Sequence, residues 1–235
     1  MHPVELKNIV KKGVKCINGI SLLGKPKYFC ISFQRTGTTS VGKFFLDHNF
    51  KVAPFSVSRA NDWTLKWFKG DYENIFKSWD FHAHQVFEDD PWWCQDFYKV
   101  LFHRFPTAKF VLLERDPDKW FDSMKNHSTG KTLGNTYRHS KIYRREMDFY
   151  NLRSNKLYSR DIDNLLPLDE THRDHYIRLY QLRNREIKEF FSEFDNERLF
   201  CARLEDHEKW QKMGKYFNIN VQAGYEAHAN KSKIQ

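Results

Sequence analysis

A short polar turn at residues 34–40 carries the side chains best suited to chemistry in this chain. It contains one arginine, Arg35, and one glycine, Gly37. Its hydroxyl residues are Thr36, Thr38, Thr39 and Ser40. The apolar stretch 28–33 before the turn predicts a buried strand, and apolar residues at helical spacing over 41–46 predict a helix after it. A strand, a tight turn and a helix start in this order point backbone N–H groups at a phosphate.

The Walker A loop, G-x-x-x-x-G-K-[ST], is the natural comparison for such a turn. Ser32 stands where the first glycine of that motif belongs, and Thr38 stands where its lysine belongs. The cation comes earlier, at Arg35, and so lies closer to a single 5′-phosphate and its leaving bond than to a triphosphate. Taken alone, the segment also fits a simple Ser/Thr-rich N-cap after a buried strand.

A second segment has the same design. Residues 109–115 form an apolar run that predicts a strand inside a parallel sheet and that ends in Arg115. Asp116 as N-cap and Pro117 as first helical residue then predict a helix start. Ser123 lies about two helical turns further on, so its hydroxyl and the Arg115 guanidinium can face one point. The alternative is an arginine paired with a neighbouring carboxylate and a serine on a solvated face.

Together the two segments resemble the nucleotide-binding motifs of sulfotransferases. Residues 33–40, F-Q-R-T-G-T-T-S, are similar to their 5′-phosphosulfate loop, and residues 115–123, R-D-P-x-x-W-x-x-S, are similar to their 3′-phosphate motif. The resemblance extends over roughly residues 27–233, with a poorly matched middle, and is strongest to the P-loop sulfotransferase proteins common in bacteria.

The resemblance implies an α/β, three-layer P-loop nucleotide-binding fold, with a mostly parallel central sheet and helices on both faces. It implies 3′-phosphoadenosine 5′-phosphosulfate (PAPS) as donor, 3′-phosphoadenosine 5′-phosphate (PAP) as product, and no metal. Arg35 would stabilise the leaving oxygen as an electrostatic clamp, because a guanidinium does not readily release its proton. The donor-binding residues implied are Arg35, Thr36, Gly37, Thr38, Thr39, Ser40, Arg115, Ser123, Asn230 and Lys231.

An acceptor must lose a proton, so a base is expected near the sulfur atom. Residues 82–92 are the best source, and we favour Asp90, then Glu88, then His84. The acidic run also fits a helix N-terminal cap. The two histidines of H-A-H lack a third ligand at a spacing suited to metal binding.

The order of elements predicts one domain over residues 1–235. Strands and helices alternate, which favours a mostly parallel sheet covered on both faces. Residues 1–26 read as a basic amphipathic helical extension, and residues 127–168 as an insertion or lid. Helices are expected at 38–49, 59–68, 72–79, 94–105, 173–194 and 207–217; further strands are expected at 50–54 and 198–204, with 80–86 as a possible strand.

The formal net charge of +9 suits a protein that holds a polyanionic donor. No zinc-finger, RNP-like or basic-zipper pattern is present, so we expect no specific nucleic-acid partner. The basic amphipathic stretch 6–17 allows a peripheral membrane contact. Widely spaced cysteines and the lack of a secretion signal or long apolar segment favour a cytoplasmic protein.

The function expected from the sequence is transfer of a sulfuryl group from PAPS to a hydroxyl or amine. The acceptor would be a small molecule or a glycan, such as a carbohydrate or glycolipid, and a small alcohol or a peptide tyrosine also stays open. Two alternatives remain open at this point: a P-loop nucleotide-dependent kinase, which needs a Walker lysine and magnesium carboxylates, and a non-catalytic protein that binds anionic ligands.

Overall fold

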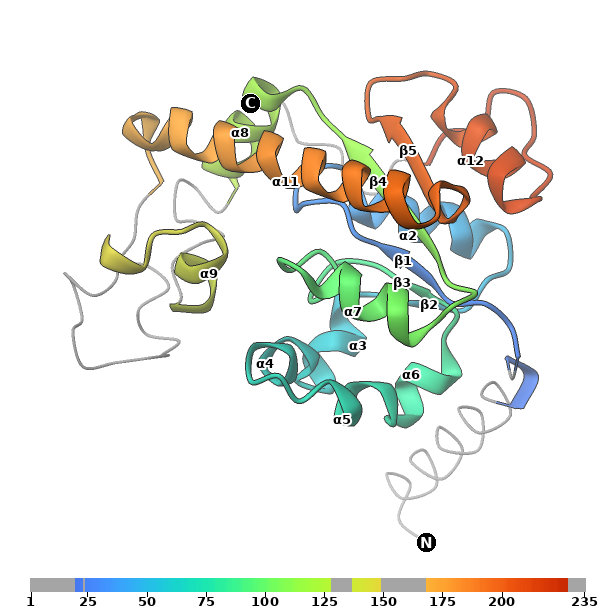
Figure 1. Cartoon of the computed structure of the whole chain (residues 1–235). Helices are drawn as coiled ribbons and strands as arrows, with labels where there is room; N and C mark the ends of the chain where they lie inside the picture. Colours follow the sequence, from blue (N-terminus) through green and yellow to red (C-terminus); the bar gives the residue numbers. More distant parts are fainter. Residues whose placement is uncertain (1–19, 23, 128–136, 149–167, 228–235) are drawn as a thin grey trace, which may run out of the picture.

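The computed structural model of the chain describes residues 20–22, 24–127, 137–148 and 168–227. A five-stranded sheet lies at its centre, with the strand order β2-β3-β1-β4-β5, and every neighbouring pair runs parallel (Figure 1). The strands are β1 (Tyr28–Cys30), β2 (Val52–Ala53), β3 (Val86–Phe87), β4 (Lys109–Glu114) and β5 (Leu199–Arg203).

Helices connect these strands and surround the sheet. Those within the described ranges are α2 (Thr38–Asp47), α3 (Phe55–Ala60), α4 (Trp63–Phe68), α5 (Tyr72–Phe76), α6 (Trp79–Ala83), α7 (Phe97–Arg104), α8 (Pro117–Asn126), α9 (Tyr137–Ile142), α11 (Arg173–Phe194) and α12 (Lys209–Phe217). Two short 3₁₀ turns cover Glu170–His172 and Asn196–Arg198. None of these helices combines the length and apolar composition that crossing a membrane requires.

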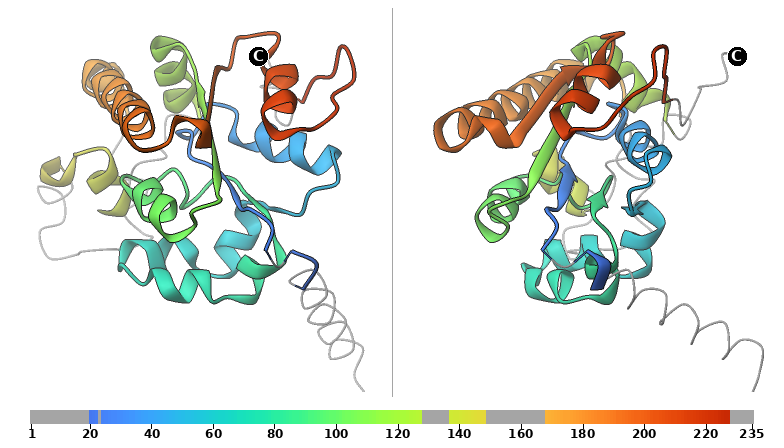
Figure 2. Two further views of the ribbon diagram at one scale, coloured as in Figure 1. Left: turned by 45° about the vertical axis from the view of Figure 1, so that its right-hand side comes forward. Right: turned by 90° about the vertical axis from the view of Figure 1, so that its right-hand side faces the viewer.

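Both faces of the sheet are buried, which explains why its strands are apolar without alternation. Tyr28 and Cys30 of β1 pack in a cluster with residues of α2 and α12. Phe29 and Ile31 point to the opposite face and pack in a cluster with residues of α7 and α11. Figure 2 shows α7 and α11 on one side of the sheet and α2 on the other. The expected three-layer α/β fold with helices on both faces is confirmed.

A third cluster, mostly aromatic, lies where the chain leaves the carboxyl end of β1. Phe33 packs there against Trp93, Trp120 and Tyr180, with ring centroids 5.6–5.7 Å apart. Trp92 and Trp93 are fully buried, so both belong to the core and neither offers a stacking surface to a ligand.

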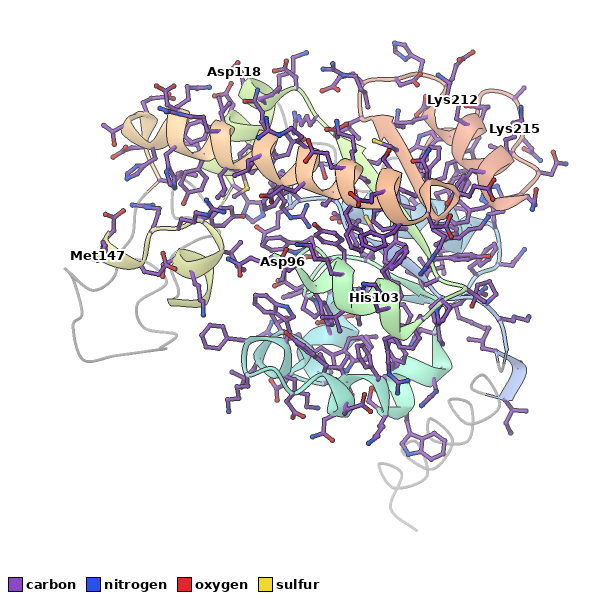
Figure 3. The ribbon with its side chains drawn as sticks, in the orientation of Figure 1. Asp96, His103, Asp118, Met147, Lys212 and Lys215 are labelled. Atoms are coloured by element: carbon purple, nitrogen blue, oxygen red, sulfur yellow. The ribbon has the colours of Figure 1, made fainter. Side chains whose placement is uncertain are left out.

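The cluster also joins α8 to α11. The Arg173 guanidinium on α11 donates to Asp118 at 3.0 Å and to Asp122 at 2.5 Å, both on α8. Figure 3 labels Asp118 on α8, beside α11. This pairing holds the helix that carries Ser123 against the long helix.

The expected elements and the observed ones agree for the long segments and differ for the short ones. Residues 173–194 form one helix, as predicted. The expected helix 59–68 is instead the end of α3 and then α4, divided at Asp62, which has a positive φ of 51°. Residues 80–86 are not a strand, because α6 continues to Ala83 and β3 begins only at Val86.

Two expected segments lie wholly or partly outside the described residues. Residues 6–17, for which we expected an amphipathic helix, are outside them, and so is much of the expected insertion 127–168. The described part of that insertion includes α9. The assignment of the whole chain to a single domain stays a prediction.

We expect Phe191→Ala to destabilise the protein by about 3–5 kcal/mol, because the fully buried ring fills the core between α11 and the sheet. Phe194→Ala is the matched control: it is the same change on the same helix, at a side chain that is 58% exposed, and should cost much less. Chemical denaturation of both variants measures the difference. Similar losses for the two would contradict the assigned face of α11.

Candidate active site

The loop after β1 is tied to β4 by a side chain. The Ser32 hydroxyl donates to the Val111 carbonyl at 3.3 Å and accepts from the Leu113 N–H at 2.7 Å. These bonds replace backbone pairing where β1 has already left the sheet. They explain why serine, which has a hydroxyl to offer, occupies the position of the first Walker glycine.

The turn itself needs left-handed backbone at two positions. Arg35 has φ 65° and Gly37 has φ 90°. A Cβ atom on residue 37 would lie 2.7 Å from Leu204 Cδ1, so both the backbone and the available space favour glycine there. The Thr36 hydroxyl donates to the Phe33 carbonyl at 2.5 Å, so it closes the turn from inside.

Gly37 is also the N-cap of α2, and no side chain caps this helix. The Ser/Thr N-cap alternative is therefore wrong. Thr38, Thr39 and Ser40 form the first turn of the ten-residue helix. Their N–H groups lack intrahelical acceptors, and the helix dipole adds partial positive charge at this end. The arrangement suits an anion.

The two expected phosphate-binding motifs meet in space. The Arg35 Nε donates to the Ser123 hydroxyl at 3.1 Å, and the Arg115 Nη1 donates to the Arg35 carbonyl at 3.2 Å. Figure 1 shows the carboxyl ends of β1 and β4 side by side, as their parallel pairing requires. Arg35 is separated in the chain by 88 positions from Ser123 and by 80 positions from Arg115, yet the three residues form one site.

This site has an excess of positive charge. Neither Arg35 nor Arg115 forms a salt bridge with any residue that the structure describes. The buried Nε of Arg115 has no hydrogen-bond acceptor there. Burial, and then the charge of Arg115, lower the pKa of Arg35. Within the described ranges, the alternative that Arg115 serves an internal ion pair does not hold.

Aromatic residues fix the position of both motifs. The Trp120 indole donates to the Gln34 carbonyl at 2.9 Å and stacks on Tyr180, with centroids 4.4 Å apart. The Tyr180 hydroxyl accepts from the Arg115 N–H at 2.7 Å and donates to the Arg115 carbonyl at 3.1 Å.

The carboxylates after β3 divide between two environments. Glu88 is 3% exposed and lies under α2, where a Cβ on Gly42 would come within 2.9 Å of its Cγ. Burial, and then the neighbouring charge of Asp89, raise the pKa of Glu88 to about 8. A hydrogen bond from the Phe55 backbone opposes this shift. Glu88 is thus enclosed, and its carboxyl is neutral at neutral pH.

Asp89 is the acidic neighbour of Arg35. The charge of Arg35 favours its ionised form, but burial and the charge of Asp90 have the larger effect and raise the pKa of Asp89. Its side chain accepts from the Asp90 N–H at 2.9 Å, and its backbone has a positive φ of 68°. Sequence reasoning ranked Asp90 and Glu88 and omitted Asp89. The left-handed turn at Asp89 helps to decide where its carboxylate lies, and the residue types in the sequence do not mark that turn.

The remaining predicted residues are not brought to this cluster. His84 precedes β3, at the amino end of the strand, and its Nδ1 lies 2.6 Å from the Asp80 carbonyl oxygen. Asn230 and Lys231 lie outside the described residues. Over the same described ranges, no group of three His, Cys, Asp or Glu side chains is placed to hold a metal ion.

Arg183 is a positioning residue that the sequence did not reveal. It is buried on α11, and its Nη2 donates to the Ile31 carbonyl at 2.9 Å and to the Trp93 carbonyl at 2.6 Å. Its guanidinium lies over the Phe33 ring, 4.4 Å from the centroid. The residue thereby connects the end of β1 to the segment after β3. Arg183 shares the buried face of α11 with Tyr180 and Ile187, and a basic residue at helical spacing among such side chains is the signal that could have indicated this role.

Comparison with known proteins agrees with this geometry. The family model described as a sulfotransferase domain matches residues 27–233, which include both arginine motifs and all five strands. A search of curated protein sequences found no match.

We expect Glu88→Gln to make stability less dependent on pH. The folded carboxyl stays protonated up to about pH 8, whereas an unfolded glutamate ionises near 4.5. The wild type therefore loses stability as pH rises through this window, and the variant lacks that loss. Thermal denaturation at about pH 5 and about pH 9 measures it.

Glu193→Gln is the matched control, since Glu193 is exposed on α11 and should leave the wild-type dependence on pH intact. If Glu88→Gln showed the same change in stability between the two pH values as the wild type, the raised pKa would be wrong.

Proposed function

Because the chain belongs to the sulfotransferase family, we propose that it transfers a sulfuryl group from PAPS to a hydroxyl or amine acceptor and releases PAP. One observation carries the proposal. The Arg35 guanidinium bonds the Ser123 hydroxyl, so the two motifs form a single cationic site. Neither arginine forms a salt bridge with a described residue, and the Arg115 Nε has no acceptor among them. Such a site suits a donor that carries phosphate groups on both sides of one ribose.

In this proposal the two motifs bind different phosphate groups of the donor. Arg115 and Ser123 would hold the 3′-phosphate, and the free Nε of Arg115 supplies an unused donor for it. The first-turn N–H groups of α2, with the hydroxyls of Thr38 and Thr39, would hold the 5′-phosphate. Thr36 would have a structural part only, because its hydroxyl already bonds Phe33.

The chemical step exchanges one bond for another at sulfur. The acceptor oxygen or nitrogen forms a bond to the sulfur atom as the bond from sulfur to the 5′-phosphate oxygen breaks. Negative charge then develops on that leaving oxygen. Arg35 stabilises this charge while keeping its own proton, because a guanidinium does not readily release it.

The acceptor proton goes to a carboxylate. Asp89 is the best placed, because it is the acidic residue whose charge interacts with Arg35, and its raised pKa strengthens it as a base near neutral pH. Asp90 adjoins it and stays a candidate. The enclosed position of Glu88 favours a structural part for that residue.

The acceptor proposed is a small molecule or a glycan, with a carbohydrate or glycolipid as the first class to examine. A cytoplasmic location is proposed with it. The described cysteines, Cys30, Cys94 and Cys201, form no disulfide bond with one another, which favours a reducing compartment.

We expect PAP to raise the melting temperature well above the effect of AMP or ATP at equal concentration, because only PAP engages both motifs. At about one hundred times Kd the gain corresponds to ~2.7 kcal/mol. Arg115→Ala should abolish the gain, whereas Arg185→Ala, at a side chain that is 67% exposed on α11, should keep it. Differential scanning fluorimetry measures both. Equal stabilisation by AMP would refute a two-phosphate site, and a larger gain with Mg²⁺-ATP would favour a kinase.

Arg35→Ala and Asp89→Asn are expected to lower kcat by about 100-fold while PAP affinity changes by less than about tenfold, because both groups act mainly in the transition state. Release of PAP from PAPS in the presence of a panel of hydroxyl and amine acceptors measures turnover, and calorimetry measures PAP binding. Full turnover by Asp89→Asn, with loss in Asp90→Asn, would transfer the role of base to Asp90.

A further inference from the structure

A cavity of about 220 Å³ lies at the amino end of the sheet, away from the candidate active site. Its walls come from the chain that enters β1, from α6, and from the turn between α7 and β4. Figure 1 shows α6 beside the chain that leads into β1. The candidate active site follows the other end of the same strand. Four of the residues that line the cavity are basic: Lys25, Lys27, His82 and Arg104.

Among the residues that the structure describes, no acidic side chain lines this cavity. Arg104 has one partner, Glu73, at 3.4 Å, in a pair that is half exposed on both sides. Lys25, Lys27 and His82 form no salt bridge with the residues that the structure describes. Within the described ranges, the cavity therefore concentrates positive charge, and only Arg104 among its basic residues has a paired carboxylate.

Burial disfavours the protonated forms of two of these basic groups. Lys27 Nζ donates to the Phe81 carbonyl at 3.1 Å and to the His84 carbonyl at 2.5 Å, and burial lowers its pKa to about 8. The pKa of His82 is lowered by burial and then by the charge of Lys27. A bound anion would reverse both effects, because an opposite charge nearby favours the protonated forms.

The sequence before the cavity adds charge of the same sign. Residues 1–19, which lead into its wall, contain four lysines and one glutamate. They offer little negative charge with which to neutralise Lys25 or Lys27. An external anion is thus the better counter-charge.

We propose that this cavity binds a phosphate group, either as inorganic phosphate or as the phosphomonoester headgroup of a lipid. Lys25 and Arg104 line it with side chains that can donate to phosphate oxygens, and Thr107 adds a hydroxyl. Its volume is below the range of sites that enclose drug-sized ligands, so it fits one small group and not a nucleotide.

Calorimetric titration of the full chain with inorganic phosphate tests the site, with PAP present to occupy the donor loop. The double variant Lys25→Gln/Arg104→Gln should bind phosphate ~10-fold or more weakly than the wild type, as expected for lost charge-assisted hydrogen bonds. Lys212→Gln/Lys215→Gln, which removes the same number of charges at exposed positions of α12 (both labelled in Figure 3), should bind as the wild type does. Equal binding by the double variant, or no binding by the wild type, overturns the proposal.

An Arg115→Ala arm separates this cavity from the donor loop even if PAP does not bind. If Arg115→Ala loses phosphate binding and the double variant keeps it, the phosphate binds at the donor loop and the proposal is overturned.

Sedimentation with vesicles then identifies the source of the phosphate group. Binding to phosphatidylcholine vesicles that contain phosphatidic acid, lost in the double variant, identifies a lipid headgroup. Phosphate binding without vesicle binding identifies the free ion.

Discussion

Hydrogen bonds between the loop after β1 and the segment β4–α8 are the interactions on which the candidate active site depends. Ser32 bonds β4, the Trp120 indole bonds the Gln34 carbonyl, and Arg35 exchanges contacts with Arg115 and Ser123. These bonds form where the chain leaves the carboxyl ends of β1 and β4, which lie side by side because the two strands pair in parallel. The sheet order thus converts two remote sequence motifs into one surface.

Holding two guanidinium groups near each other has a cost, and the surrounding core offsets it. Arg115 is fixed through its backbone by the Tyr180 hydroxyl, and Arg183 binds the carbonyls of Ile31 and Trp93 from the far side. Tyr180 and Arg183, whose side chains make these hydrogen bonds, both lie on α11, and the apolar side of this helix packs on the sheet. The long helix therefore supports the cationic site that an anionic donor would neutralise.

The sequence predicted the structure best in long segments, where the spacing of apolar residues matches the face that packs in the core. The buried strand before Arg115 and the helix 173–194 have apolar spacings that only one structure satisfies, and both were predicted. The short elements 79–87 were not, because a five-residue helix and a two-residue strand contain too few residues to show a period. Asp89 was missed for a related reason. A left-handed turn decides where its carboxylate lies, and residue types alone do not reveal such a turn.

The hydroxyl of Ser32 also has an evolutionary consequence. A loop that grips triphosphates would need glycine at this position and lysine at Thr38, and the two replacements must occur in some order. Glycine alone removes both hydrogen bonds to β4, about 1–3 kcal/mol of stability. Lysine alone forces a long charged chain into a position that is 7% exposed. Each single replacement is thus expected to destabilise the loop, which favours keeping Ser32 and Thr38 together.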